Sequence, residues 1–228
     1  MPSGVYLQGG TGSQKPGTQI NSDLLWGAIL AAIRPYDYTG AGGQILGHFR
    51  VAQAVVNTAA QTGPLFTWRW ANAPSVGLMV PTHITCSYVL TTVFTTAQAI
   101  DIKATIARSY TISATGGTAI MPLAATKSNT MRTTMGASQV TDMRYGNVTS
   151  GTRLLDSQPF AVAPLANGNT ALASTLPQVE LYNILNSGDH PIVHAQNEGV
   201  EIAANTALGA AGVGNYYITV SWAEVVVF

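Results

Sequence analysis

The chain has 228 residues, with ten basic and ten acidic side chains, so its formal net charge at pH 7 is zero. Charged residues make up 9% of the sequence, against about 25% in ordinary soluble domains, while the hydrophobic fraction of 46% is typical. So few Lys and Arg residues argue against a nucleic-acid-binding surface. No apolar run reaches the about 18 residues that span a membrane, and the N-terminus has no secretory signal. We therefore expect a protein that is made in the cytoplasm and binds neither nucleic acid nor membranes.

The charges are unevenly placed along the chain. All ten Lys and Arg residues lie between Lys15 and Arg153, together with four acids, so this part carries +6. Residues 154–228 contain six acids and no Lys or Arg, and carry −6. The two parts either neutralise each other within one subunit, which we favour, or meet between copies of the chain. If the two parts meet between copies, added salt should weaken the assembly; if they meet within one subunit, it should not.

The first 43 residues predict an arm followed by a short helix. Residues 1–20 are rich in Gly, Gln and Thr, which favours an extended arm without a core of its own. Residues 21–23 offer N-caps for a helix over residues 24–33, which Pro35 ends. This helix is apolar nearly all round and must be covered, either by the chain's own sheet or by a neighbouring subunit. Its predicted interface residues are Leu24, Leu25, Trp26, Ile29, Leu30 and Ile33.

From residue 44 onward, apolar and polar side chains alternate with the period of two that is typical of strands with one buried face. The predicted strands are 44–57, 65–70, 76–80, 83–95, 100–112, 190–196, 198–205 and 216–223, separated by turn clusters that include 115–118 and 209–214. We predict an all-β protein in which residues 44–228 form a single antiparallel β-sandwich of jelly-roll type. Residues 120–185 are expected to form long excursions that reach a partner.

Most aromatic side chains fall on the buried positions of these strands, which favours core residues over ligand platforms. This applies to Trp68, Trp70, Tyr88, Tyr110 and Trp222. Tyr216 and Tyr217 are adjacent and must point to opposite faces of their strand. We therefore expect one of this pair at the surface, and predict Tyr217 as a further interface residue.

No pattern in the sequence predicts a catalytic centre, a metal site or a cofactor site. His190 and His194 have the spacing of helical zinc ligands, but Pro191 and two β-branched residues between them favour a strand, on which the two would lie about 13 Å apart. Cys86 excludes a disulfide within the chain, and its alternating surroundings predict a buried strand residue instead of a reactive thiol. The Gly-rich residues 9–18 lack the pattern of a phosphate-binding loop. We therefore predict that the protein is not an enzyme and needs no cofactor.

Several segments resemble poorly characterised virion proteins of tailed bacteriophages. The C-terminal resemblance lies in HPIV at 190–193, AQNEG at 195–199, TALGAAG at 206–212 and VSWAEV at 220–225. The central resemblance lies in FTTAQ at 94–98, IAR at 106–108, TGGT at 115–118 and RTTMG at 132–136. Together they cover about half of the chain, and they form turns and strands instead of a catalytic motif. The resemblance implies a head decoration, a spike or fibre base, or another accessory shell protein.

These observations predict a non-enzymatic structural protein located in the virion. It would assemble as a homo-oligomer, a trimer or higher, and contact other virion proteins such as the major capsid protein. The alternative is a carbohydrate-binding module of a phage or cell-surface fibre, with an exposed aromatic ring as the sugar platform. A hydrolase with paired carboxylates is a third, less favoured hypothesis, because only ten acids are present.

Overall fold

The computed structural model describes residues 45–57, 63–120, 136–149, 151–168, 178–186, 190–207, 209 and 211–226. These residues form strands and connecting segments without a helix, so the predicted all-β class is confirmed. The predicted arm and helix lie outside the described residues, and with them the predicted interface residues Leu24, Leu25, Trp26, Ile29, Leu30 and Ile33.

The described residues contain eleven strands, most of them where alternation of side chains predicts them. In chain order they are β1 (Ile45–Asn57), β2 (Pro64–Trp70), β3 (Leu78–Thr92), β4 (Gln98–Arg108), β5 (Thr115–Ile120), β6 (Asp142–Thr149), β7 (Leu154–Leu155), β8 (Ala161–Gly168), β9 (Val179–Asn183), β10 (Glu198–Ala204) and β11 (Val213–Val225).

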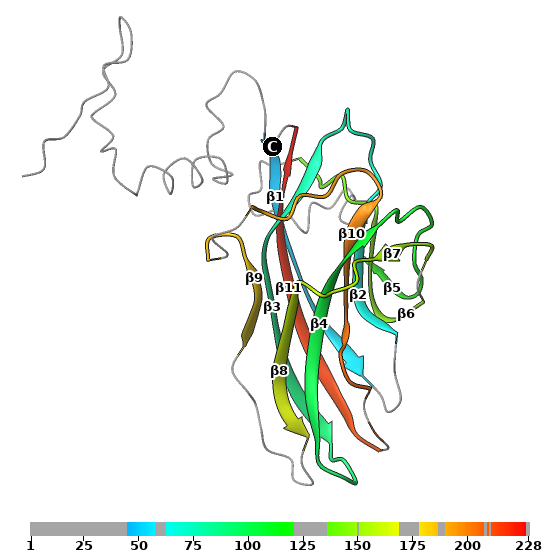
Figure 1. Cartoon of the computed structure of the whole chain (residues 1–228), viewed down its shortest axis with the longest axis vertical. Helices are drawn as coiled ribbons and strands as arrows, with labels where there is room; N and C mark the ends of the chain where they lie inside the picture. The colour runs from blue at the N-terminus through cyan, green and yellow to red at the C-terminus, as the bar shows by residue number, and fades with distance from the viewer. Residues whose placement is uncertain are drawn as a thin grey trace, which may run out of the picture.

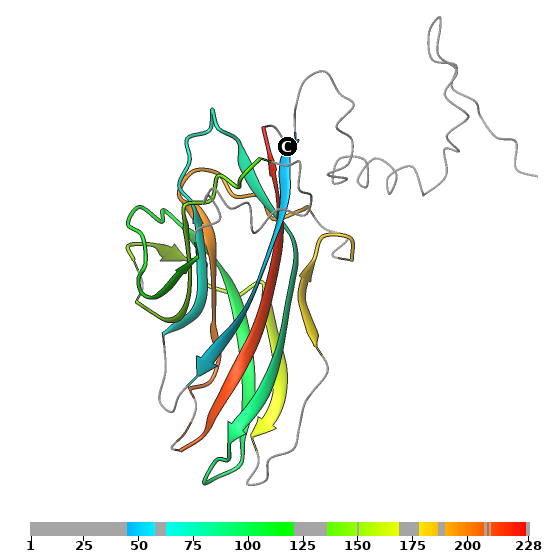
Figure 2. The same cartoon turned by 180° about the vertical axis from the view of Figure 1, so that it is seen from behind.

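The strands form two sheets in which every pair is antiparallel. Sheet A has the order β1-β11-β3-β9, and sheet B has the order β5-β6-β2-β10-β4-β7. Strand β8 pairs with Gln98–Ala104 of β4, and β7 with Ala107 and Arg108, so both lie along the same edge of β4. The long strands of both sheets run along the length of the molecule (Figures 1 and 2).

Eight of the strands follow a simple pairing rule. Early and late strands pair as β1 with β11, β2 with β10, β3 with β9 and β4 with β8. The β11–β3 and β10–β4 pairs then join these two-stranded ribbons into the two sheets. The chain passes from one sheet to the other between β1 and β2, β2 and β3, and β3 and β4, and again between β8 and β9, β9 and β10, and β10 and β11. Strands β5, β6 and β7 are an addition between β4 and β8, within sheet B.

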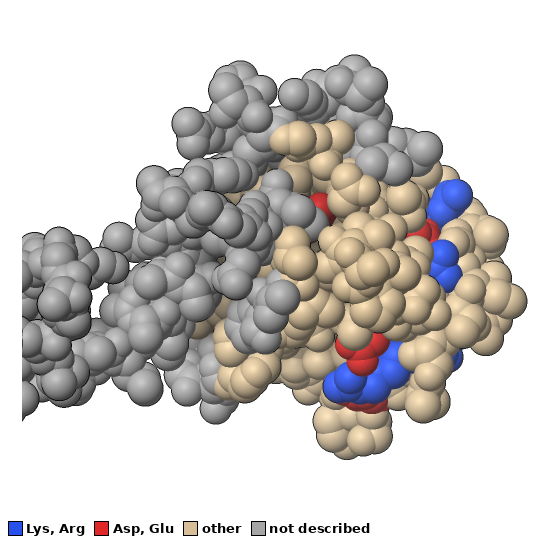
Figure 3. All heavy atoms as spheres, turned by 90° about the horizontal axis from the view of Figure 1, so that it is seen from above, with Lys and Arg blue, Asp and Glu red and all other residues tan. Residues whose placement is uncertain are grey.

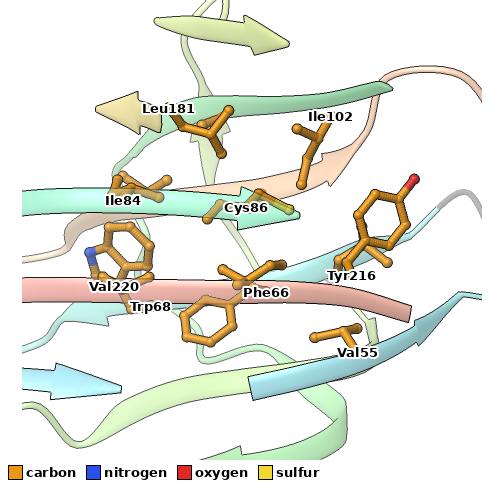
Figure 4. Packing of buried hydrophobic residues seen from close by; sticks show 14 of the residues in the cluster. Val55, Phe66, Trp68, Ile84, Cys86, Ile102, Leu181, Tyr216 and Val220 are labelled. Atoms are coloured by element: carbon orange, nitrogen blue, oxygen red, sulfur yellow. The ribbon is translucent and has the colours of Figure 1, made fainter. Parts of the chain in front are cut away.

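One apolar core fills the space between the sheets. Sheet A contributes Val55, Ile84, Cys86, Leu181, Tyr216 and Val220, and sheet B contributes Phe66, Trp68 and Ile102, all of which point into the same layer (Figure 4). The predicted core aromatics Trp68, Trp70, Tyr88 and Trp222 are fully buried. The period of two thus buries one face of β1 and of β4, as the alternation predicts, whereas nearly every residue of β2 and β10 is buried.

The separate strands predicted over 76–80 and 83–95 form one strand, β3. The separation was wrong because Pro81, which has no N–H to donate, does not interrupt this sheet. The register shifts here: Ser221 pairs with His83 and Trp222 with Pro81, which leaves Thr82 as the extra residue of a bulge. A bulge is one of the positions at which a sheet accepts proline.

The prediction of a strand over 190–196 was also wrong. The only ladder contact of this segment among the described residues is an isolated bridge between His194 and Met79. Its other backbone groups are bonded differently: the N–H of Ile192 donates to the Tyr182 hydroxyl at 3.0 Å. Alternation over so few residues therefore predicted a strand that does not form, because a backbone group of this segment bonds to a side chain instead of to a neighbouring strand.

The region around 120–185 is not simply a set of excursions, because β6, β7, β8 and β9 lie within it. The cluster predicted as a turn at 115–118 is likewise the start of β5. Gly116 and Gly117 have φ angles of 66° and 53°, and the register shifts between Gly116 and Thr118. A Cβ at Gly117 would lie 2.4 Å from the Tyr145 carbonyl oxygen, so glycine is required at this bulge.

Candidate functional site

The outer side of sheet A carries the most unusual surface of the described residues. Residues directly opposite in paired strands share a face, so three rows can be read across β1, β11 and β3. They are Ala52–Thr219–Thr85, Ala54–Tyr217–Ser87 and Val56–Asn215–Val89. We call these nine residues the A face. Eight of them are partly or fully exposed, whereas Thr85 is buried and accepts a hydrogen bond from the Gln178 amide. None of the nine is charged, although the row of Thr85 continues to Glu180 on β9, whereas the solvent side of an antiparallel sheet ordinarily carries polar and charged residues.

Tyr217 stands at the centre of the A face. Its neighbour Tyr216 lies in the core, with its ring centroid 4.8 Å from that of Tyr88 in an edge-to-face contact. Tyr217 is 42% exposed and is the only exposed aromatic side chain among the described residues. The expectation that one of the two tyrosines lies at the surface is confirmed, and that residue is Tyr217; its role in an interface stays a prediction.

Charged groups flank the A face at opposite edges of sheet A. Arg50 is exposed on β1, in the row Arg50–Ser221–His83. Across the sheet, Glu180 of β9 contacts His83 at 3.0 Å and accepts hydrogen bonds from the side chains of Asn183 and Asn186. Hydrogen bonds from these amides, chiefly from Asn183, hold the pKa of Glu180 below its ordinary value. Glu180 is therefore a carboxylate at neutral pH.

The outer side of sheet B is occupied by a buried aromatic ring between two arginines. Chain reversal after Arg108, where Ser109 has a φ of 49°, carries Tyr110 back over the sheet. Its ring is 1% exposed and lies between the guanidinium groups of Arg69 and Arg153, at 5.8 and 5.7 Å from the ring centroid. The predicted burial of Tyr110 is confirmed, although the residue packs outside the main core.

Ion pairs connect the basic and acidic parts of the chain within one subunit. Arg108 pairs with both Asp156 and Glu198 at 2.8 Å, and Arg153 pairs with Glu201. Each of these three contacts joins a base from the first 153 residues to an acid from the remainder. In Figure 3 the acidic and basic side chains lie in small groups, and most of the described surface in view is uncharged. Neutralisation within the subunit therefore accounts for these residues.

The two histidines considered as metal ligands have different surroundings. His190 is exposed, and its Nδ1 lies 2.7 Å from the carbonyl oxygen of Pro191. His194 is 1% exposed and packs edge-on against Trp68, with ring centroids 6.1 Å apart. Burial, with a smaller contribution from Arg108, lowers the pKa of His194 to about 3. Among the described residues, no group of three or more His, Cys, Asp or Glu side chains has the arrangement of a metal site.

The remaining residues with reactive side chains serve the packing of the sheets. Cys86 is fully buried in β3, and burial raises the pKa of its thiol, so the prediction of a buried strand residue is confirmed. A raised pKa keeps the thiol protonated at neutral pH.

Sequence reasoning missed the fully buried carboxyl group of Glu224. Glu224 of β11 is fully buried and accepts hydrogen bonds from the Ser138 hydroxyl at 2.5 Å, the Gln139 N–H at 2.9 Å and the Trp222 indole N–H at 3.1 Å. It fastens residues 138–140 to sheet A. Burial raises the pKa of Glu224 in spite of these hydrogen bonds. The signal in the sequence is weak, because Glu224 simply occupies an inward position at the end of an alternating strand.

In comparisons with known proteins, no family model, no curated protein and no solved structure matches the chain. The described residues also contain no helix with the length and apolar character needed to cross a membrane.

Proposed function

We propose that this chain is a non-enzymatic structural protein of a bacteriophage virion: a capsid decoration protein, a spike or fibre base, or an accessory shell protein. It acts by assembling with copies of itself and with other virion proteins such as the major capsid protein. Its location is the particle.

The observation that carries the proposal is the order of the strands. Without β5, β6 and β7, eight strands remain, four in each sheet, and early strands pair with late ones throughout. A jelly roll is built in this way, from eight strands in two sheets, and this architecture recurs in viral capsid and lectin domains. We infer that the sandwich is a jelly roll with an addition between β4 and β8. Of these two uses of the fold, the resemblance of several segments to phage virion proteins favours the viral structural one.

Fold alone does not select a function, so the chemistry of the surface must also agree. The A face has no charged residue, and four arginine–carboxylate contacts are made inside the described part of the chain. Burying charge at an interface is costly, while Ala, Ser, Thr, Asn and Tyr lose little on desolvation when they find new partners. This surface supports function by assembly.

The test has two parts, beginning with the molar mass of the full chain in solution. Size-exclusion chromatography with light scattering should give an oligomer; a stable monomer at all concentrations would count against assembly. An antiserum against the chain, applied to purified tailed-phage particles from its source, should then label a fixed position in electron micrographs. Particles without label would reject the virion assignment.

The alternative is a carbohydrate-binding module, and the exposure of Tyr217 favours it. An exposed ring on a flat sheet face, flanked by Asn215 and Thr219, offers an apolar platform with hydrogen-bonding groups beside it. Saturable binding on a glycan array that Tyr217→Ala abolishes would support this function. Equal signals from the wild type and Tyr217→Ala would reject the platform.

A further inference from the structure

The occupant of the A face can be derived from the placement of its large, small and charged residues. We infer that it is a second copy of this chain, packed face to face about a twofold axis that runs parallel to the strands between β11 and β3. This inference rests on the proposed function in one respect, since both require self-association. It adds the surface, the symmetry and the contacts.

The first argument is shape. A twofold axis in this position places β11 of one copy over β3 of the other and keeps each row at the same height. Tyr217 then projects onto Ser87 of the partner copy, a small side chain in the same row. The two Tyr217 side chains lie on either side of the axis, offset by one strand spacing of about 4.8 Å, within the range of paired aromatic rings. The large side chain of each copy therefore meets a small side chain of the other.

The second argument is charge. The same rotation places β1 of one copy over β9 of the other. Arg50 then lies opposite the row of His83, where the Glu180 carboxylate is held at 3.0 Å from the His83 ring. Symmetry makes this contact twice. Within one chain the two strands are three spacings apart, about 14 Å, which exceeds the Debye length of about 8 Å at physiological salt. Arg50 has other contacts within its own chain, but a contact between Arg50 and Glu180 can form only between copies.

Other symmetric arrangements of the same face fit less well. An axis across the strands through the central row would place β11 on β11, so that the two Tyr217 rings meet head-on. β1 would then lie over β1 of the partner copy, which leaves Arg50 on the edge of the sheet opposite to the Glu180 carboxylate of β9. The A face itself spans only about 14 Å by 20 Å from strand geometry, below the about 800 Å² per partner of a standard interface. A stable contact must therefore include the charged rim, which the axis parallel to the strands provides.

The experiment measures the dissociation constant of the twofold contact by sedimentation velocity on the full chain. Tyr217→Arg should weaken it at least about a hundredfold, because it removes the central ring and places two like charges beside the axis. Leu154→Ser is the matched control: Leu154 is 66% exposed on β7 of sheet B, and its loss should change nothing. Far-UV circular dichroism of each variant establishes that the fold is intact.

Charge reversal tests the symmetry. Arg50→Glu and Glu180→Arg should each weaken association about five- to tenfold at low salt, and the double variant should return to within about threefold of the wild type. Restoration follows only if the two residues meet between copies. An oligomer that tolerates Tyr217→Arg, or a double variant weaker than both single ones, overturns this inference while leaving the proposed function standing. A wild-type chain that is monomeric at every concentration overturns both.

Discussion

His194 makes the stability of the fold sensitive to acid. The ring is 1% exposed, and neither of its nitrogens has a hydrogen-bond partner among the described residues. Burial lowers the pKa of this histidine from 6.5 to about 3 in the folded chain. The unfolded chain therefore binds a proton on this residue below about pH 6.5, while the folded chain does not. Stability from the neutral ring is present above that pH and is lost as the pH falls toward 3.

The size of the effect follows from the two pKa values. Each unit of pH between them changes the free energy of unfolding by up to about 1.4 kcal/mol. At pH 5 the loss from His194 alone is about 2 kcal/mol, a large part of the stability of an ordinary domain. His48 acts in the same direction, because burial, with a smaller contribution from Arg50, lowers its pKa as well.

The assay compares urea unfolding of the wild type and His194→Leu at several values between pH 7.5 and 5. Leucine has nearly the volume of histidine and leaves no ring nitrogen to protonate, so the difference in unfolding free energy should move by about 2 kcal/mol in favour of the variant at pH 5. His190→Leu, which removes an exposed imidazole from the same segment, is the control. A pH-independent difference between wild type and His194→Leu would refute the reasoning.

Two further predictions concern buried positions. Burial raises the pKa of Glu224, so the stability that its protonated form contributes is lost as the pH rises through the folded pKa. The difference in unfolding free energy between Glu224→Gln and the wild type should therefore shift in favour of the variant between pH 4.5 and 8. A difference that stays constant over this range would contradict the prediction. A Cβ at Gly199 would lie 1.9 Å from the Trp68 carbonyl oxygen, so Gly199→Ala should push β10 away from β2. The substitution should lower the unfolding free energy in urea by about 3 kcal/mol. An unchanged unfolding midpoint would show that the two strands can separate here without loss of stability.

The long strands could be predicted because burial on one face leaves a direct trace in the sequence. Along β11, buried Tyr216, Ile218 and Val220 alternate with more exposed partners, and this pattern needs no knowledge of the fold. The same pattern identified Tyr216 and Tyr217 as a pair on opposite faces. It favoured Tyr217 as the exposed member, because Tyr217 alternates with Thr219 and Ser221, while Tyr216 shares its side of the strand with Ile218 and Val220.

Other strands were missed because their pairing is set by the topology. Strand β8 contains Pro164 and pairs along the edge of β4, with a register shift between Ile100 and Asp101. An edge tolerates proline, but a sequence that reads Pro, Ala and Asn favours a loop. Strand β6 contains Gly146, with a φ of 97°, and is held between β5 and β2. Neighbours distant in sequence, and not local preference, make these segments strands.

The candidate site was open to prediction only in part. Tyr217 follows from alternation, yet the A face depends on which strands lie beside β11. Sequence alone could not place Arg50 and Glu180 on opposite edges of one sheet, because they are 130 positions apart in the chain. The charge count behaves in the same way. The count shows that residues 1–153 carry +6 and residues 154–228 carry −6, but only the order of the strands determines which basic and acidic residues form ion pairs.

Strand order also explains how a chain with 9% charged residues accommodates its charge. Strands β4, β7 and β10 are neighbours in sheet B, so Arg108 on β4 meets Glu198 on β10 and Asp156 just after β7. These pairs lie on sheet B, away from the A face, and assembly through sheet A does not break them. Added salt should therefore weaken assembly only through the rim contacts of Arg50 and Glu180, a modest effect. Steep salt dependence would mean that the basic and acidic parts of the chain meet between copies after all.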